Sequence, residues 1–208
     1  MAGMGFHPKE DFMKVAILGE RSGIVRDAFI RHGHDAISCD FYPTEVPGPH
    51  IEGNFFSFNW SGYDLIIAHP DCTYMAVSGN RYYSNTPERL QAAEDIKRIW
   101  FLPVPRLCIE NPVGQINTYL PFMPKPQYIQ PWQFGHDASK KTGLWLRGLP
   151  KLVPTDIIKK SRYANQTPSG QNKLGPSPDR AYLRAKTYLG IAEAMATQWG
   201  NIEENSHD

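Results

Sequence analysis

The chain has 208 residues, 41% of them hydrophobic and 21% charged, and its 22 basic and 21 acidic side chains leave a net charge of +1. This composition is typical of a globular protein, and no apolar run approaches the roughly 18 residues that a membrane span needs. Its three cysteines, Cys39, Cys72 and Cys108, form no CxxC pair, which excludes a disulfide framework and disfavours a metal site.

Four short apolar runs stop at a glycine or at a polar residue, as buried strands of a parallel sheet do. They cover residues 13–18, 35–39, 63–68 and 106–109. Apolar side chains recur at helical spacing over residues 24–32, and again between Thr86-Pro87 and Pro103. The second helix is expected to bury Leu90, Ala93, Ile96, Ile99 and Trp100. Alternating strands and helices predict an open, mostly parallel α/β sheet with helices on both faces.

Beyond Pro112 the pattern loosens. Two further strands are expected over residues 128–134 and 142–146, and a closing helix over residues 188–199. We expect a single α/β domain over residues 13–200, flanked by an extension at 1–12 and a polar tail at 201–208. The amino terminus carries acids and shows no signal-peptide pattern, which predicts a cytoplasmic protein.

Positive charge is concentrated in residues 137–186, hereafter the basic segment. It contains eleven basic and three acidic residues, a net charge of +8, so the rest of the chain carries −7. This asymmetry predicts a face that binds a polyanion, and a solvated surface is the alternative. The residues expected to contact nucleic acid are Lys140, Lys141, Lys159, Lys160, Arg162 and Arg184.

Ligands of open α/β sheets bind beyond the carboxyl ends of the strands. Gly19 to Gly23 follows the first strand, and a glycine turn there lets a ligand approach the backbone. Asp40 ends the second strand, where an acid suits ribose hydroxyls. Together they indicate a nucleoside-containing cofactor, and the absence of a GxGxxG pattern disfavours a dinucleotide.

Two more corners of the same edge carry reactive side chains. Cys72, in His69-Pro70-Asp71-Cys72-Thr73, is a candidate nucleophile or a buried small hydrophobe. Glu110, in Glu110-Asn111-Pro112, is either presented to a substrate or solvated in a turn. From these residues alone, both alternatives stay open at each corner.

Taken together, the corners resemble the cytosine carbon-5 DNA methyltransferase family, in the family's order over most of the chain. Residues 15–23 look like its cofactor-binding turn, Pro70-Asp71-Cys72 like its nucleophile loop, and Glu110-Asn111-Pro112-Val113 like its Glu-Asn-Val corner. Phe134-Gly135 before Lys140-Lys141 is similar to a later basic motif, and residues 186–196 resemble the closing helix. The resemblance implies a Rossmann-like class I methyltransferase fold.

The resemblance also implies a chemistry. A Cys72 thiolate would add to carbon 6 of cytosine, Glu110 would hydrogen-bond ring nitrogen 3, and Asp71 and Asn111 would flank them. S-adenosylmethionine would be the cofactor, and a flipped or single-stranded base in DNA the substrate. The implied cofactor-binding residues are Leu18, Gly19, Ser22, Gly23, Asp40, Phe41, Asn54 and Pro70. Compact enzymes of this kind resemble phage-encoded ones that mark a genome against nucleases.

Departures from the family's pattern motivate two alternatives. Asp71 stands where the family has proline, and a neighbouring carboxylate raises a thiol's pKa. This favours an enzyme that acts on a free pyrimidine nucleotide or transfers another group. In place of a target-recognition region, the chain has only residues 148–184, expected to form a basic flap. A non-catalytic binder of DNA or cofactor is therefore the third hypothesis, and low or externally set sequence specificity is expected of an enzyme.

Overall fold

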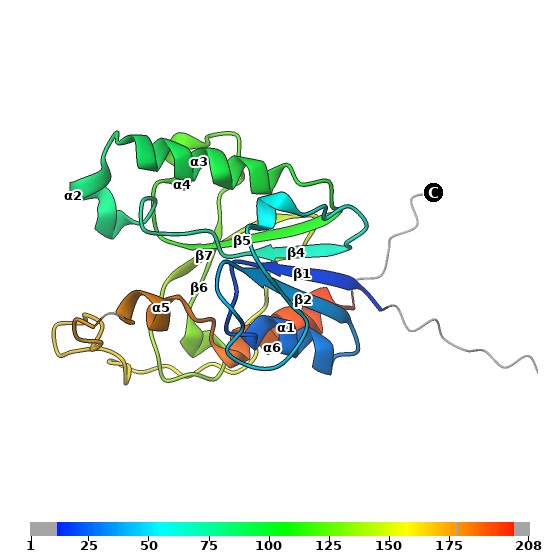
Figure 1. Cartoon of the computed structure of the whole chain (residues 1–208). Helices are drawn as coiled ribbons and strands as arrows, with labels where there is room; N and C mark the ends of the chain where they lie inside the picture. The colour runs from blue at the N-terminus through cyan, green and yellow to red at the C-terminus, as the bar shows by residue number, and fades with distance from the viewer. Residues whose placement is uncertain (1–11, 178, 202–208) are drawn as a thin grey trace, which may run out of the picture.

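A computed structural model describes residues 12–177 and 179–201 of the chain (Figure 1). The strands in this part are β1 (Lys14–Leu18), β2 (Asp35–Asp40), β3 (His50–Glu52), β4 (Leu65–Ala68), β5 (Arg106–Pro112), β6 (Gln127–Ile129) and β7 (Thr142–Arg147). They form one sheet in the order β3-β2-β1-β4-β5-β7-β6. The first five strands of that order pair in parallel, and β7 is antiparallel to both β5 and β6. This confirms the expected open, mostly parallel sheet.

Helices cover both faces of the sheet. The α-helices are α1 (Ile24–Arg31), α2 (Asn80–Tyr83), α3 (Pro87–Trp100), α4 (Ile116–Tyr119), α5 (Arg180–Ala185) and α6 (Leu189–Trp199). The short 3-10 helices are η1 (Phe55–Ser57), η2 (Val77–Gly79) and η3 (Pro131–Gln133). Figure 1 shows α2, α3 and α4 on one face and α1, α5 and α6 on the other.

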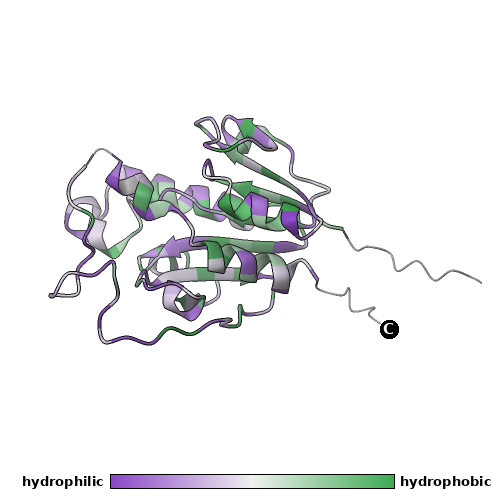
Figure 2. Ribbon diagram, turned by 90° about the horizontal axis from the view of Figure 1, so that it is seen from below, coloured by the Kyte–Doolittle hydropathy of each residue, from purple (hydrophilic) through white to green (hydrophobic). Residues whose placement is uncertain are grey.

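The two faces of the sheet have separate cores, because successive side chains of a strand point in opposite directions. Val15 and Ile17 of β1 pack beneath α1 and α6, beside Trp199. Ala16 and Leu18 pack on the opposite face, in the core that contains Ile96 of α3. The hydropathy colouring of Figure 2 shows the strands as mostly hydrophobic and the helices as two-sided.

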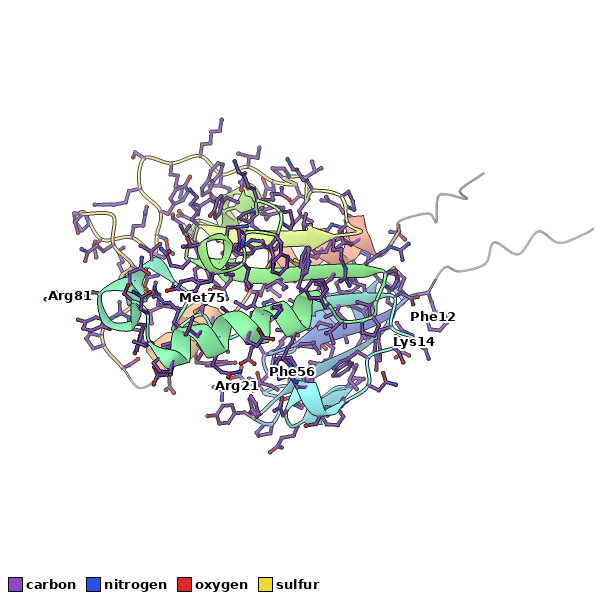
Figure 3. All side chains as sticks on the ribbon, turned by 90° about the horizontal axis from the view of Figure 1, so that it is seen from above. Phe12, Lys14, Arg21, Phe56, Met75 and Arg81 are labelled. Atoms are coloured by element: carbon purple, nitrogen blue, oxygen red, sulfur yellow. The ribbon has the colours of Figure 1, made fainter. Side chains whose placement is uncertain are left out.

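Strand register brings the predicted corners to one edge. Leu18 pairs with Cys39 on one side and with Ala68 on the other, and Ala68 pairs with Ile109. The residues that follow these positions therefore lie at one level, hereafter the carboxyl rim. Figure 3 shows Phe12 and Lys14 at the opposite edge of the sheet from Met75 and Arg81.

Two expected strands were wrong in extent, and one residue of α3 was wrong in burial. Glu110-Asn111-Pro112 lies inside β5 and not after it, because β7 pairs with β5 as far as Pro112. The strand expected over 128–134 ends at Ile129, since Pro131 has no N–H to donate and begins η3. Leu90, expected in the buried stripe of α3, is 56% exposed, because Arg89 turns inward in its place and donates to the Tyr74 carbonyl.

Apart from the three 3-10 helices, four elements were not expected from the sequence. The edge strand β3 has only three residues and no fully buried side chain. The helices α2, α4 and α5 have four to six residues, which is too short for a periodic apolar stripe to be visible. Their positions follow from packing around the carboxyl rim and not from local patterning.

Candidate active site

The loop after β4 is tied to the end of β5. The Asn111 side-chain amide is almost fully buried and donates to the Pro70 carbonyl at 3.2 Å. The Cys72 carbonyl accepts from the backbone N–H groups of Met75 and Ala76, so the chain turns directly after the cysteine. These bonds fix half-buried Cys72 beside the end of the strand that carries Glu110.

The thiol of Cys72 is held in its protonated form. Burial raises its pKa, and the charges of Asp71 and Glu110 raise it further. The positive charge of Lys140 acts in the opposite direction. A nucleophilic role therefore requires that a bound substrate, or the approach of more positive charge, assist loss of the proton.

Asp71 caps the turn that carries the cysteine. Its Oδ1 accepts from the Thr73 backbone N–H at 2.8 Å and from the Thr73 hydroxyl at 2.6 Å. A side chain that bonds to the backbone two residues on stiffens a turn. Asp71 thus restrains the loop that presents Cys72 while its charge opposes thiolate formation.

Replacing Asp71 by Asn should speed alkylation of Cys72 by iodoacetamide severalfold near pH 8. The amide keeps an oxygen for the Thr73 N–H but removes the negative charge, so the thiolate fraction at a given pH rises. The change is modest because Asp71 is exposed and its field is screened. If Asp71→Asn and the unchanged protein were alkylated at the same rate at every pH from 7 to 9, this account of the Cys72 pKa would be contradicted.

Glu110 and His69 form a buried acid–base pair. His69 Nδ1 lies 2.7 Å from Glu110 Oε2, and the two side chains are only 13% and 11% exposed. Burial alone would raise the pKa of Glu110, but the charge of Lys140 and the hydrogen bond from His69 outweigh it and leave the pKa below its ordinary value. Sequence patterns did not single out His69, although a titratable residue directly after a predicted strand was a usable signal.

The two lysines of the basic motif differ in place. The Lys140 ammonium donates to the carbonyls of Ala185 and Lys186, both at 3.2 Å, and its charge reaches Glu110 and Cys72. Lys141 is exposed, with its ammonium 4.6 Å from the centre of the Tyr128 ring. Lys140 therefore belongs to the candidate active site, and Lys141 lies outside it.

The turn after β1 is filled by a residue that the sequence did not single out. Buried Glu20 accepts from the backbone N–H groups of Val25 and Arg26 at 2.8 and 3.1 Å, and from the Ser22 hydroxyl at 3.1 Å. These N–H groups lie at the start of α1, where a helix attracts anions. Since Glu20 already occupies them, the start of α1 does not serve as a site for a ligand's anionic group.

The expected cofactor residues divide into two groups. Leu18 has a fully buried side chain, Ser22 bonds to Glu20, and Gly23 packs against the Arg26 guanidinium. Gly19 has a left-handed φ of 76°, and its N–H donates to the Cys39 carbonyl at 2.7 Å.

The remaining four reach the surface of the carboxyl rim. Asp40 Oδ1 accepts from the Tyr42 N–H at 3.0 Å, and Phe41 is 62% exposed. Asn54 Oδ1 accepts from the Phe56 N–H at 2.9 Å and begins η1. Pro70 borders an open hollow of about 490 Å³ between the nucleophile loop and the first turns of α3. That hollow is lined by Pro70, Asp71, Tyr74, Pro87, Glu88, Gln91, Ala92 and Asp95.

The basic segment returns to the rim through α5. The Arg21 guanidinium lies 3.6 Å from the centre of the Tyr182 ring, and Lys186 pairs with Glu45 at 2.7 Å. The other expected nucleic-acid contacts, Lys159, Lys160, Arg162 and Arg184, are all exposed, and Lys160 pairs with Asp137. The segment therefore combines anchored residues beside the rim with exposed cations farther along it.

No protein-family model and no curated protein sequence matches the chain. Among solved structures, it is similar to a prophage-encoded E. coli protein described as a DNA modification methyltransferase (13% identity, TM-score 0.47, covering 70% of this chain and 52% of that one). It is also similar to the Entamoeba histolytica methyltransferase EhMeth (14%, 0.49, 71% and 58%) and to the S. pombe Dnmt2 methyltransferase (15%, 0.45, 67% and 51%). The chain thus spans little more than half the length of each of these proteins.

Within residues 12–177 and 179–201, no three His, Cys, Asp or Glu side chains gather as a metal ion would require. The same part of the chain contains no helix with the length and hydropathy needed to cross a membrane.

Proposed function

We propose that this protein methylates carbon 5 of cytosine in DNA, with S-adenosylmethionine as the donor and a covalent Cys72 adduct as the intermediate. The observation that carries the proposal is the juxtaposition at adjacent strand ends of Cys72 and buried Glu110, with the charge of Lys140 acting on both. The choice of DNA over a free nucleotide rests on the +8 charge of the basic segment. The short flap favours low or externally set sequence specificity.

In this mechanism each side chain has one task. Cys72 gives up its proton to solvent water, and its sulfur bonds to carbon 6 of the flipped base. Glu110 in its acid form donates a proton to ring nitrogen 3, which neutralises the charge that the addition places on the ring. S-adenosylmethionine, when bound, supplies an electrophilic methyl group to carbon 5. The carbon-5 proton then leaves to solvent water, and the bond between sulfur and carbon 6 breaks to release Cys72.

The exposed residues of the rim suit the nucleoside part of that cofactor. The Asp40 carboxylate keeps one oxygen for ribose hydroxyls, and the exposed Phe41 ring follows directly. The hollow beside Pro70 offers room for an aromatic base. Since Glu20 fills the start of α1, the carboxylate of the cofactor would be held elsewhere on the rim.

The test is a covalent trap with duplex DNA that contains 5-fluorocytosine. Fluorine cannot leave carbon 5 as a proton does, so the enzyme and the DNA should stay joined in the presence of S-adenosylmethionine. The joined peptide should contain Cys72, Cys72→Ala should abolish the adduct, and Cys39→Ala, in the core, should retain it. Turnover of a free cytidine nucleotide without a trap on DNA would favour the second hypothesis, and binding without turnover the third.

The exposed cations of the flap should govern DNA affinity. Replacing Lys159, Lys160 and Arg162 together by Ala should weaken binding and reduce the slope of log Kd against log salt by about two to three, or roughly one per lost phosphate contact. Because Lys160 is already paired with Asp137, it contributes less to phosphate binding, and the expected change in slope is nearer two. Fluorescence anisotropy at several salt concentrations measures the slope, with Lys97→Ala on α3 as the matched control. An unchanged slope would remove this part of the flap from the DNA-binding surface.

A further inference from the structure

We propose that His69 is a positioning residue for Glu110, whose side chain it holds by one carboxylate oxygen so that the other is presented to ring nitrogen 3 of the substrate base. The proposal rests on the proposed function, since it assigns His69 a task in the protonation of that nitrogen. Neither the sequence patterns nor the family resemblance assigned a task to this residue.

The backbone of His69 is fixed against the end of β1. Its N–H donates to the Leu18 carbonyl of β1 at 2.7 Å. Its own carbonyl lies against Gly19, where a Cβ atom would approach the oxygen to 2.4 Å. A residue held this closely by its neighbours presents its side chain from a constant point, which positioning of another group requires.

The side chain of His69 has one hydrogen bond in the described part of the chain, and that bond is to Glu110. The lowered pKa of Glu110 favours its carboxylate form, and a carboxylate oxygen in this pair accepts from an Nδ1–H of the ring. Nε2 is buried and has no hydrogen-bond partner among the described residues. A histidine that served only to fill space would not leave one ring nitrogen without a partner and commit the other to an acid.

The other charged and titratable groups around Glu110 cannot do the same task. Lys140 commits its ammonium to the carbonyls of Ala185 and Lys186, so it supplies charge without a directed bond to the carboxylate. Thr142 and Tyr188 line the same pocket as Glu110, but the Thr142 hydroxyl donates to the Lys140 carbonyl at 3.1 Å and the Tyr188 side chain bonds to Asn165. The thiols of Cys72 and Cys108 and the carboxylate of Asp71 are also nearby. Asp71 and a thiolate would repel a carboxylate, and neutral thiols are weak donors.

The proton balance of the step is simple. The O–H bond of protonated Glu110 breaks as the bond from nitrogen 3 to hydrogen forms, and a carboxylate remains. His69 Nδ1–H keeps its own proton and stabilises this carboxylate by a short hydrogen bond. When Cys72 leaves carbon 6, the proton returns from nitrogen 3 to the carboxylate. His69 thus acts through Glu110 without itself touching the reacting atoms.

Three substitutions separate positioning from mere packing. The amide nitrogen of Asn can occupy the place of the histidine Nδ1–H, that of Gln the place of Nε2–H, and Ala removes both donors. We expect His69→Ala to slow single-turnover adduct formation with 5-fluorocytosine DNA about 10- to 100-fold. His69→Asn should recover most of this loss and His69→Gln should not, with unchanged affinity for S-adenosylmethionine in all three. Equal rates for the Asn and Ala variants, or a fully active Ala variant, would overturn the proposal.

The pH profile gives a second kinetic readout. Loss of the Nδ1–H donor should raise the pKa of Glu110. Because the pKa of Cys72 is the higher of the two, the acidic limb of the profile ends at the pKa of Glu110, and this limb should shift upward in His69→Ala and return in His69→Asn. A variant that had only lost packing would keep the position of this limb. An unshifted limb in His69→Ala would therefore count against the proposal.

A spectroscopic measurement keeps His69 testable apart from the methyltransferase activity. If the unchanged protein forms no adduct at all, the proposed function fails whatever the His69 variants do. The ¹⁵N NMR signals of the His69 ring, assigned by their loss in His69→Asn, should show a proton on Nδ1. A ring with its only proton on Nε2 would overturn the positioning role by itself.

Discussion

Replacing Glu110 by Gln is expected to slow methyl transfer by about 10²–10⁴-fold, the usual contribution of a general acid. The amide can hydrogen-bond ring nitrogen 3, but it cannot give it a proton. Glu110 is the described residue at the carboxyl rim whose carboxyl group is buried beside Cys72 and joined to a histidine. Single-turnover transfer of a labelled methyl group to cytosine-containing DNA measures the effect.

Measuring cofactor binding shows whether the slower methyl transfer of Glu110→Gln comes from the lost acid or from damage to the carboxyl rim. Calorimetric titration should give the same affinity for S-adenosylmethionine in Glu110→Gln as in the unchanged protein. Asp40→Ala, which removes the carboxylate at the end of β2, should instead lose binding. If Glu110→Gln kept the full transfer rate, Glu110 would not be the acid of this reaction.

The same pair of residues predicts a bell-shaped pH dependence. The reaction needs Cys72 as a thiolate, and its raised pKa makes the rate climb as pH rises. It also needs Glu110 in the acid form, and its lowered pKa makes the rate fall as pH rises. Only a small fraction of the enzyme holds both forms at once. Because Gln does not titrate, Glu110→Gln should lose the falling limb of the pH profile and keep the climbing one.

Gly19→Ala should destabilise the fold by about 2–5 kcal/mol. Two independent terms add at this position. A residue with a side chain costs about 1–2 kcal/mol in the left-handed region, where Gly19 has a φ of 76°. The new Cβ would also lie 2.4 Å from the His69 carbonyl oxygen, which is backbone and is fixed by the bond from its own N–H to β1.

Gly33 provides a matched control for this substitution. It has a similar φ of 86°, but nothing lies within 4 Å of the Cβ that Ala would add. Gly33→Ala should therefore cost only the conformational term, about 1–2 kcal/mol. Urea unfolding followed by circular dichroism measures both variants. If the two lost the same free energy of unfolding, the approach of Gly19 to His69 would carry no energetic weight.

Local sequence patterns were sufficient to predict the main strands and helices of the protein. The four parallel strands expected from apolar runs and the helices α1, α3 and α6 are present, because burial on both faces imposes continuous hydrophobicity on a strand and a stripe on a helix. The ends of a strand were less well predicted where pairing with a neighbouring strand determined them. Glu110 became part of β5 only because β7 pairs along the same segment, and no local signal encodes that pairing.

The sequence by itself determined which reactive residues follow the apolar runs of the strands, Cys72, Glu110 and Asp40 among them. The end of an apolar run is visible in the sequence because it depends only on the residues of that run. Only the tertiary structure decided what surrounds these reactive residues. His69 and Glu110 are 41 positions apart, and α5 returns 45 residues after Lys140 to receive its ammonium. Such contacts depend on strand order and register, which arise from the packing of the whole sheet, so the acid–base pair and its charge could not be seen before the chain was folded.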